Sequence, residues 1–150
     1  MHIVLFEPEI PQNTGNIART CSAIRASLHL IKPLGFSLED KYLKRAGLDY
    51  WQLLDLKVHI NWEDFLQENP SLPMYFSSVR GHKSYHEIKY PANACFVFGS
   101  ETQGLPKEIL EKYANNTIKI PMIKEARSLN ISNAVAVIAF EALRQWNFKY

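Results

Sequence analysis

The sequence predicts an α/β fold in which helices cover both faces of a mainly parallel sheet. Short apolar runs rich in β-branched and aromatic residues alternate along the chain with stretches of helical periodicity. The runs are continuously apolar, which is typical of parallel strands buried on both faces. The expected strands are residues 2–6, 28–32, 56–60, 74–78, 94–99 and 117–120.

Five stretches between and after these strands are expected to be helices. In the first, apolar side chains from Ile17 to Ile24 form one face, and Arg19 lies off that face. Asn13 or Thr14 is its expected N-cap, because both side chains can accept a hydrogen bond from the first turn. The expected helices are 14–26, 39–47, 62–68, 106–114 and 132–148.

The last of these helices is apolar nearly all round. Between Ile131 and Leu143, only Ser132, Asn133 and Glu141 are polar. A helix of this kind must be buried on several sides. In a chain of 150 residues one of those sides is expected to be a second subunit, so we expect a homodimer.

Length and composition predict a single domain spanning residues 1–150. The hydrophobic fraction of 47% and the charged fraction of 21% are ordinary for a globular protein. The net charge of +2 excludes a polycationic tail, so an RNA or DNA partner would be met by a local basic patch. The sequence shows neither a signal peptide nor an apolar run of the roughly 20 residues that span a bilayer. We therefore expect a cytoplasmic protein with no membrane partner.

Cysteine and histidine positions give little support for metal or redox chemistry. Cys21 and Cys95 both lie in apolar surroundings and are expected to be buried free thiols. No Cys/His cluster has ligand spacing, so no metal is expected. All five histidines lie outside the polar loops described next, which argues against a histidine-based acid–base mechanism.

Three polar loops rich in Gly, Asn and Ser follow expected strands, at 7–23, 98–106 and 120–136. Ligands of open α/β sheets bind beyond the carboxyl ends of strands, so these loops are expected to form one composite site. Dinucleotide, P-loop and nucleophile-elbow motifs are absent. Small residues with amide and hydroxyl donors suit a neutral or zwitterionic nucleoside better than a triphosphate. Taken singly, Gly99 and Gly104 are better explained by turn formation, and Asn13 and Asn16 by helix capping.

Together the loops resemble the signature motifs of the SPOUT (SpoU–TrmD) superfamily of RNA methyltransferases. The matching segments are PQNTGNIARTCSA, FGSETQGLP and IPM followed by RSLNISNAVAVIAFEALRQ. The opening IVLFEPEIPQNTGNIART and the stretch DKYLKRAGLDYW (40–51) resemble the TrmL-type (YibK) branch, which methylates the ribose 2′-OH of the tRNA wobble nucleotide, cytidine or modified uridine at position 34, usually in leucine tRNAs. The chain departs from relatives that carry Tyr-Glu-Ala, because it has Phe140-Glu141-Ala142.

This resemblance implies a single-domain SPOUT fold with a C-terminal trefoil knot that forms an S-adenosylmethionine pocket, in an obligate dimer. It implies cofactor-binding roles for Phe76, Gly99, Gly104, Ile120, Ser128 and Leu129. It implies catalytic or substrate-orienting roles for Asn13, Arg19, Glu101, Ser128 and Asn130.

The resemblance implies tRNA as the partner, and its anticodon stem-loop is a fitting target because sequence-specific RNA recognition usually targets single-stranded loops. Arg19, Arg127, Lys44 and Arg45 are the candidate RNA contacts. For Lys44 and Arg45, which lie with Lys41 within about one helical turn, a solvated surface is an equal explanation. Two other functions stay open: a 2′-O-methyltransferase with another tRNA position or ribosomal RNA as target, and a catalytically silent RNA-binding dimer.

Overall fold

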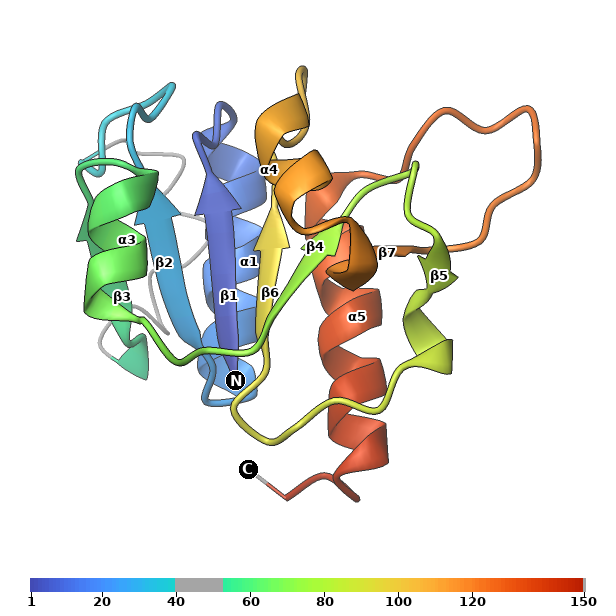
Figure 1. Ribbon diagram of the computed structural model, residues 1–150. Helices are drawn as coiled ribbons and strands as arrows, with labels where there is room; N and C mark the ends of the chain where they lie inside the picture. Colours follow the sequence, from blue (N-terminus) through green and yellow to red (C-terminus); the bar gives the residue numbers. More distant parts are fainter. Residues whose placement is uncertain (40–52, 150) are drawn as a thin grey trace.

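A seven-stranded sheet, all of whose pairings are parallel, forms the centre of the molecule (Figure 1). The computed structural model describes residues 1–39 and 53–149. The strand order is β3-β2-β1-β6-β4-β7-β5, so the chain starts in the middle and builds outward in both directions. The strands are β1 His2–Phe6, β2 Ser27–Ile31, β3 Leu56–His59, β4 Met74–Ser77, β5 Lys83–Ser84, β6 Cys95–Phe98 and β7 Thr117–Lys119.

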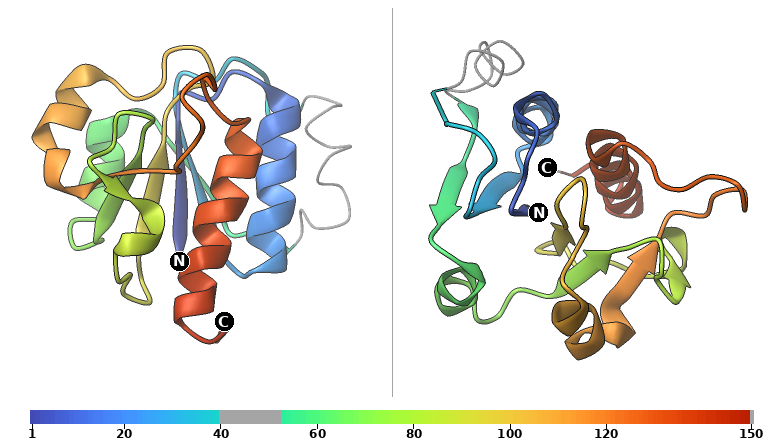
Figure 2. Two further views of the ribbon diagram at one scale, coloured as in Figure 1. Left: turned by 90° about the vertical axis from the view of Figure 1, so that its right-hand side faces the viewer. Right: turned by 90° about the horizontal axis from the view of Figure 1, so that it is seen from above.

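Helices cover both faces of this sheet, as the sequence predicts. Seen from above, α1 and α5 lie side by side on one face, while α3 and α4 cover the other (Figure 2). The bounds are α1 Pro11–Ala23, α3 Trp62–Glu68, α4 Lys107–Lys112 and α5 Ile131–Gln145, with 3-10 turns η2 Tyr85–Glu87 and η3 Ala114–Asn116.

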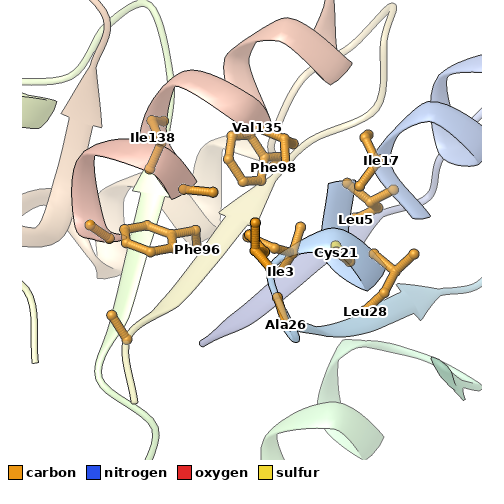
Figure 3. Close-up of a cluster of buried hydrophobic side chains, with 14 of the residues drawn as sticks. Ile3, Leu5, Ile17, Cys21, Ala26, Leu28, Phe96, Phe98, Val135 and Ile138 are labelled. Carbon is orange, nitrogen blue, oxygen red and sulfur yellow. The ribbon is translucent and has the colours of Figure 1, made fainter. Parts of the chain in front are cut away.

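Two apolar clusters separate the layers. The larger joins the sheet to α1 and α5 and includes Leu5, Ile17, Phe96 and Ile138 (Figure 3). The smaller lies under α3 and α4 and includes Phe65. Cys21 and Cys95 are buried free thiols, as expected. Burial raises the pKa of each thiol to about 12.

The structure corrects the expected start of the first helix. α1 begins at Pro11, three residues before the expected boundary, and Ile10 occupies the N-cap position without a side-chain cap bond. Pro11 suits the first position of the helix because proline lacks the N–H that would go unpaired there. Asn13 is therefore not the N-cap, and its amide is available for contacts outside the helix.

Other differences concern elements without a pattern of their own. The two-residue strand β5 was not expected, since Lys83 and Ser84 form neither an apolar run nor an alternation.

The expected helix 39–47 lies outside the described residues from position 40 onward. The trefoil knot stays a prediction. No helix in the described ranges has both the length and the apolarity needed to cross a membrane.

The last helix is covered on only part of its circumference. Val135, Ile138 and Ala142 are buried against the rest of the chain, whereas the Phe140 side chain is 45% exposed. Contacts within the described residues therefore cover only part of the apolar surface of this helix.

Candidate functional site

A cavity of about 530 Å³ lies beyond the carboxyl ends of β4, β6 and β7. Its size is within the range of roughly 300–1,000 Å³ usual for small-molecule sites. The three loops singled out from the sequence all contribute to its wall, together with the segment that follows β4. The lining includes Asn13, Ser77 to Arg80, Phe98 to Leu105, Ile120, Met122 and Arg127 to Ile131.

The Glu101 carboxylate fastens the first loop to the second. It accepts hydrogen bonds from the backbone N–H groups of Glu9 at 2.8 Å and Ile10 at 3.3 Å, and from the Asn13 side-chain amide at 3.0 Å. These donors stand at the entry to α1, where N–H groups lack partners within the helix and the helix dipole favours a negative charge. Ile10 has no side-chain acceptor at the N-cap, so Glu101 from the second loop accepts the hydrogen bonds at the start of α1 instead.

A second carboxylate strengthens the same junction from the other side. Glu9 accepts hydrogen bonds from the backbone N–H of Thr102 at 3.0 Å and from its hydroxyl at 2.6 Å. Each loop therefore presents a carboxylate to the backbone of the other. Sequence reasoning missed Glu9 and Thr102, because two polar residues in loops 93 positions apart carry no local signal of pairing.

The third loop joins this network through two asparagines. The Asn130 amide nitrogen donates to Asn13 Oδ1 at 3.0 Å, and Asn130 Oδ1 accepts from the Ser132 backbone N–H at 2.9 Å. Asn130 is the N-cap of α5. It therefore does two things, capping its own helix and tying that helix to α1.

The direction of this chain of hydrogen bonds is set at one end. An ionised carboxylate only accepts, so Asn13 must turn its NH₂ toward Glu101 and its oxygen toward Asn130. Asn130 must then donate to Asn13 with its NH₂, which leaves its oxygen for the Ser132 N–H. The charge on Glu101 thereby fixes both asparagine side chains.

Glycines allow the second loop to fold closely on itself. A Cβ atom on Gly99 would lie 2.0 Å from the carbonyl carbon of Gly104 and 2.2 Å from the nitrogen of Leu105. Gly104 has φ +70° and pairs with Ser100 in an isolated bridge. The loop needs both glycines, one for close approach and one for left-handed backbone.

Most of the residues selected from the sequence meet at this cavity. Those that line it are Asn13, Gly99, Glu101, Gly104, Ile120, Arg127, Ser128, Leu129 and Asn130. Arg19 is exposed on α1 and is not part of the lining. Lys44 and Arg45 lie outside the described residues.

Phe76 needs a correction, because its side chain does not line the cavity. The ring is 0% exposed and packs under α4, 4.4 Å between centroids from Tyr113 and 6.1 Å from Trp62. Successive side chains of a strand point to opposite faces, and Phe76 points to the α3/α4 face. The wall is formed by the residues that follow it, Ser77 to Arg80.

Most of the chain matches the profile of a known family. Residues 1–140 match the profile of the SpoU rRNA Methylase family. The chain belongs to the SpoU methylase family.

Curated relatives extend the match over nearly the whole chain. The chain is 48% identical to a tRNA (cytidine(34)-2′-O)-methyltransferase of Saccharophagus degradans, covering 98% of this chain and 96% of that protein. It is 47% identical to the enzyme of the same name from Methylovorus glucosotrophus, covering 97% of this chain and 96% of that protein.

Solved structures of SpoU proteins share the fold. One, described as giving insights into the 2-OH methylation of C/U34 on tRNA, superposes with a TM-score of 0.94 at 46% identity, covering 99% of this chain and 97% of the other. An AdoMet-bound rRNA methyltransferase from Sinorhizobium meliloti superposes with a TM-score of 0.85 at 26% identity, covering 95% of this chain and 55% of the other.

The cavity of this SpoU protein fits the chemistry of a methyl donor with an adenosine and an amino-acid part. Phe98, Leu105 and Ile120 offer apolar surface to a flat base, and exposed loop backbone offers hydrogen bonds to a nucleoside. The guanidinium groups of Arg80 and Arg127 suit a carboxylate or a phosphate. Among the described residues no histidine lines the cavity, in keeping with the sequence expectation.

Proposed function

We propose that the protein is an S-adenosylmethionine-dependent methyltransferase that methylates the ribose 2′-OH of the wobble nucleotide of tRNA, cytidine or modified uridine at position 34. Leucine tRNAs are its proposed substrates, read through their anticodon stem-loop in the cytoplasm. The observation that carries the proposal is the hydrogen-bonded chain Glu101–Asn13–Asn130, which joins three distant loops around one cavity in a member of the SpoU family.

The methyl donor is proposed to bind in the cavity, held by Gly99, Gly104, Ile120, Ser128 and Leu129. S-adenosylmethionine supplies an electrophilic methyl group on a sulfonium. Transfer forms a bond between the ribose 2′-oxygen and the methyl carbon, breaks the carbon–sulfur bond, and releases the 2′-OH proton and S-adenosylhomocysteine. The solved AdoMet complex of a 26%-identical relative supports this assignment.

Orientation is the main contribution that the described geometry supports. Holding donor and acceptor in near-attack geometry can supply roughly 7–11 kcal/mol of the barrier in favourable cases. The asparagine pair is well placed for this, since each side chain is fixed at both its oxygen and its nitrogen by a partner. Asn13 and Asn130 keep further N–H donors that can face the reacting oxygen.

Arg19 is proposed to act on the RNA rather than on the methyl donor. Its position outside the cavity lining fits that role. A guanidinium does not deprotonate in proteins, so it is a poor general base. It is suited to bind a phosphate or the 2′-oxygen and to stabilise negative charge that develops there. Arg127, which lines the cavity, is a second proposed RNA contact.

The enzyme is proposed to be a homodimer. The half-exposed Phe140 on α5 supports this, because it leaves a large apolar side chain uncovered on a helix whose other apolar residues pack against α1 and the sheet. The proposed test is sedimentation velocity of the wild type and of Phe140→Asp, with Phe148→Asp as a control that changes an equally exposed ring. Dissociation of the α5 variant alone is expected.

Methyl transfer from labelled donor to total tRNA, followed by nucleoside mapping, tests the proposed function. Label at the 2′-oxygen of nucleotide 34 is the expected result. Label at another nucleotide would instead support a different tRNA site. No label in tRNA, together with label in a parallel reaction on ribosomal RNA, would remove the tRNA assignment. Calorimetry with S-adenosylmethionine tests the silent-binder alternative, which requires that the donor does not bind.

A further inference from the structure

Three histidines form a row across β1, β2 and β3, the half of the sheet away from the cavity. His2 in β1, His29 in β2 and His59 in β3 lie on adjacent strands. His2 Nδ1 is 3.0 Å from His29 Nε2, and His29 Nδ1 is 2.9 Å from His59 Nε2. The row is buried at its far end, since the His59 side chain is only 1% exposed. The proposed methylation uses none of these residues.

The last nitrogen of this row lacks a hydrogen-bond partner. His59 Nδ1 is buried and makes no hydrogen bond within the described part of the chain. It faces two carboxylates of α3, with Glu68 Oε2 at 3.5 Å and Asp64 Oδ2 at 3.9 Å. Both distances exceed the roughly 2.7–2.9 Å of a charge-assisted N–H···O bond. A buried polar atom left in this way is unusual and costs free energy.

The two carboxylates converge because α3 places them there. Asp64 and Glu68 are four residues apart and therefore lie on one side of the helix, where like charges destabilise each other. The side chains are 34% and 57% exposed, so the group is open to solvent on the carboxylate side. A cation between them and the imidazole would relieve the repulsion and give the orphaned nitrogen a partner.

We propose that His59 Nδ1, Asp64 and Glu68 form a binding site for a divalent transition metal of the zinc type. The ligand atoms of the three residues all lie within 4.8 Å of one another. Zinc–nitrogen and zinc–oxygen bonds are about 2.0–2.2 Å, so two ligands of one tetrahedral ion lie about 3.4 Å apart, and the two carboxylates would draw in around an ion. Imidazole with carboxylates is a donor set that suits zinc, and water would complete the coordination.

The neighbours of His59 fix the orientation of its ring, as the neighbours of a metal-ligating histidine do. A ligating histidine almost always uses its other nitrogen to contact a supporting group, and here that group is His29. Phe65 packs edge-on against both rings, with centroids 5.3 Å from His29 and 5.2 Å from His59. The proposed tautomer has His59 Nε2–H donating to His29 Nδ1, which leaves the Nδ1 lone pair free for the ion.

The proposed site is separate from the cavity and structural in effect. It ties α3 to the end of β3, whereas the cavity lies beyond β4, β6 and β7, with β1 and β2 between them (Figure 1). It departs from the sequence expectation of no metal. That expectation considered Cys/His spacing, whereas this group has one histidine and relies on a turn that folds α3 back over β3.

Zinc titration of the whole protein tests the proposal. After removal of metals with EDTA, calorimetry with ZnCl₂ is expected to show one ion per chain. Glu68→Gln is expected to weaken binding by at least about tenfold, the lower end of the loss seen when even an outer-shell partner is removed. Glu63→Gln, which removes an exposed carboxylate from the same helix, is the matched control and is expected to bind like the wild type.

Thermal unfolding with and without ZnCl₂ provides a second readout. The wild type and Glu63→Gln are expected to gain Tm with zinc, whereas Asp64→Asn and Glu68→Gln are expected to gain less at the same zinc concentration. The proposal is overturned if the wild type binds no zinc stoichiometrically. It is also overturned if Glu68→Gln binds as tightly as Glu63→Gln, since the ion would then lie elsewhere, for example at the exposed His82 or His86.

Discussion

Asn13 and Asn130 are 117 residues apart in the chain, yet the Asn130 amide donates a hydrogen bond to Asn13 Oδ1 at 3.0 Å. This contact joins the first turn of α1 to the N-cap of α5. Because Glu101 sets the orientation of Asn13, the second loop controls how the first and third loops meet. Substitutions of Glu101, Asn13 or Asn130 should therefore affect the cavity more than their effect on the free energy of unfolding suggests.

Replacing Asn130 with serine separates its two contacts. Serine is a good N-cap, so α5 should keep its start and the free energy of unfolding should change by less than about 0.5 kcal/mol. The shorter side chain cannot reach Asn13, so methyl transfer should fall strongly. Asn130→Ala loses the cap as well, so its free energy of unfolding should fall by a further ~0.5–2 kcal/mol. Denaturant unfolding and labelled methyl transfer measure both effects, and equal turnover in wild type and Asn130→Ser would contradict the positioning role.

Removing the charge of Glu101 should loosen all three loops. Glu101→Gln replaces one acceptor oxygen by a donor, which opposes the N–H groups of Glu9 and Ile10 and frees the Asn13 amide to rotate. Hydrogen bonds to charged groups are worth about 1.5–3 kcal/mol each, so a measurable drop in Tm and weaker binding of S-adenosylmethionine are expected. Glu108→Gln in the first turn of α4 is the control. An unchanged donor affinity in Glu101→Gln would refute the anchor.

Two glycine substitutions in the same loop should differ in severity. Gly99→Ala places a methyl group 2.0 Å from the Gly104 backbone, and the loop must move to admit it. Gly104→Ala meets open space and pays only for its left-handed backbone, about 1–2 kcal/mol. Donor binding should therefore be lost in Gly99→Ala and weakened in Gly104→Ala. Calorimetry with S-adenosylmethionine measures both, and the reverse order would show that the contact at Gly99 does not shape the site.

Arg19→Lys keeps the charge but not the two-pronged geometry of the guanidinium. If Arg19 binds the RNA as proposed, turnover should fall by at least about tenfold, equivalent to 1.4 kcal/mol. The affinity for S-adenosylmethionine should stay unchanged, since Arg19 does not line the cavity. Steady-state kinetics with tRNA and calorimetry with the donor separate these effects. Near-full turnover with unchanged RNA affinity would remove the proposed role.

The buried thiols predict a loss of stability at alkaline pH. Burial raises the pKa of Cys21 and Cys95 from 9.0 to about 12, so between these values the unfolded chain binds fewer protons than the folded one. The free energy of unfolding should then decrease as pH rises from about 9 toward 12. Urea unfolding at pH 8 and pH 10 checks the sign. Cys21→Ala should show a smaller dependence, and a flat profile in the wild type would contradict the burial of both groups.

The sequence was sufficient for the strands and the polar loops because each depends on local patterns. All six expected strands are present within one or two residues, and Gly99, Glu101 and Ser128 fall around the same cavity as predicted. The knot came from resemblance and the dimer from both the apolar last helix and the resemblance, and both stay predictions.

What the sequence could not supply are contacts between side chains far apart in the chain. Asn13 looked like an N-cap, because capping is the common local use of such a residue before a helix. Its partners are Glu101 and Asn130, and only the fold brings them together. Phe76 was assigned to the cavity by the family resemblance, but the alternation of β4 turns its ring to the other face. The row from His2 to His59 depends on strand order, which spacing does not reveal.

The contact between Asn13 and Asn130 also determines when the site can be completed during synthesis of the chain. A ribosome that adds 5–20 residues per second needs roughly 6–23 s to make the 117 residues between them. Throughout that time the nascent chain has Ile10 and Asn13 of the cavity wall but lacks Asn130, the partner of Asn13 in the third loop. A chain released early, through a premature stop codon before residue 127, would lack the third wall and could not compete with finished enzyme for its substrates.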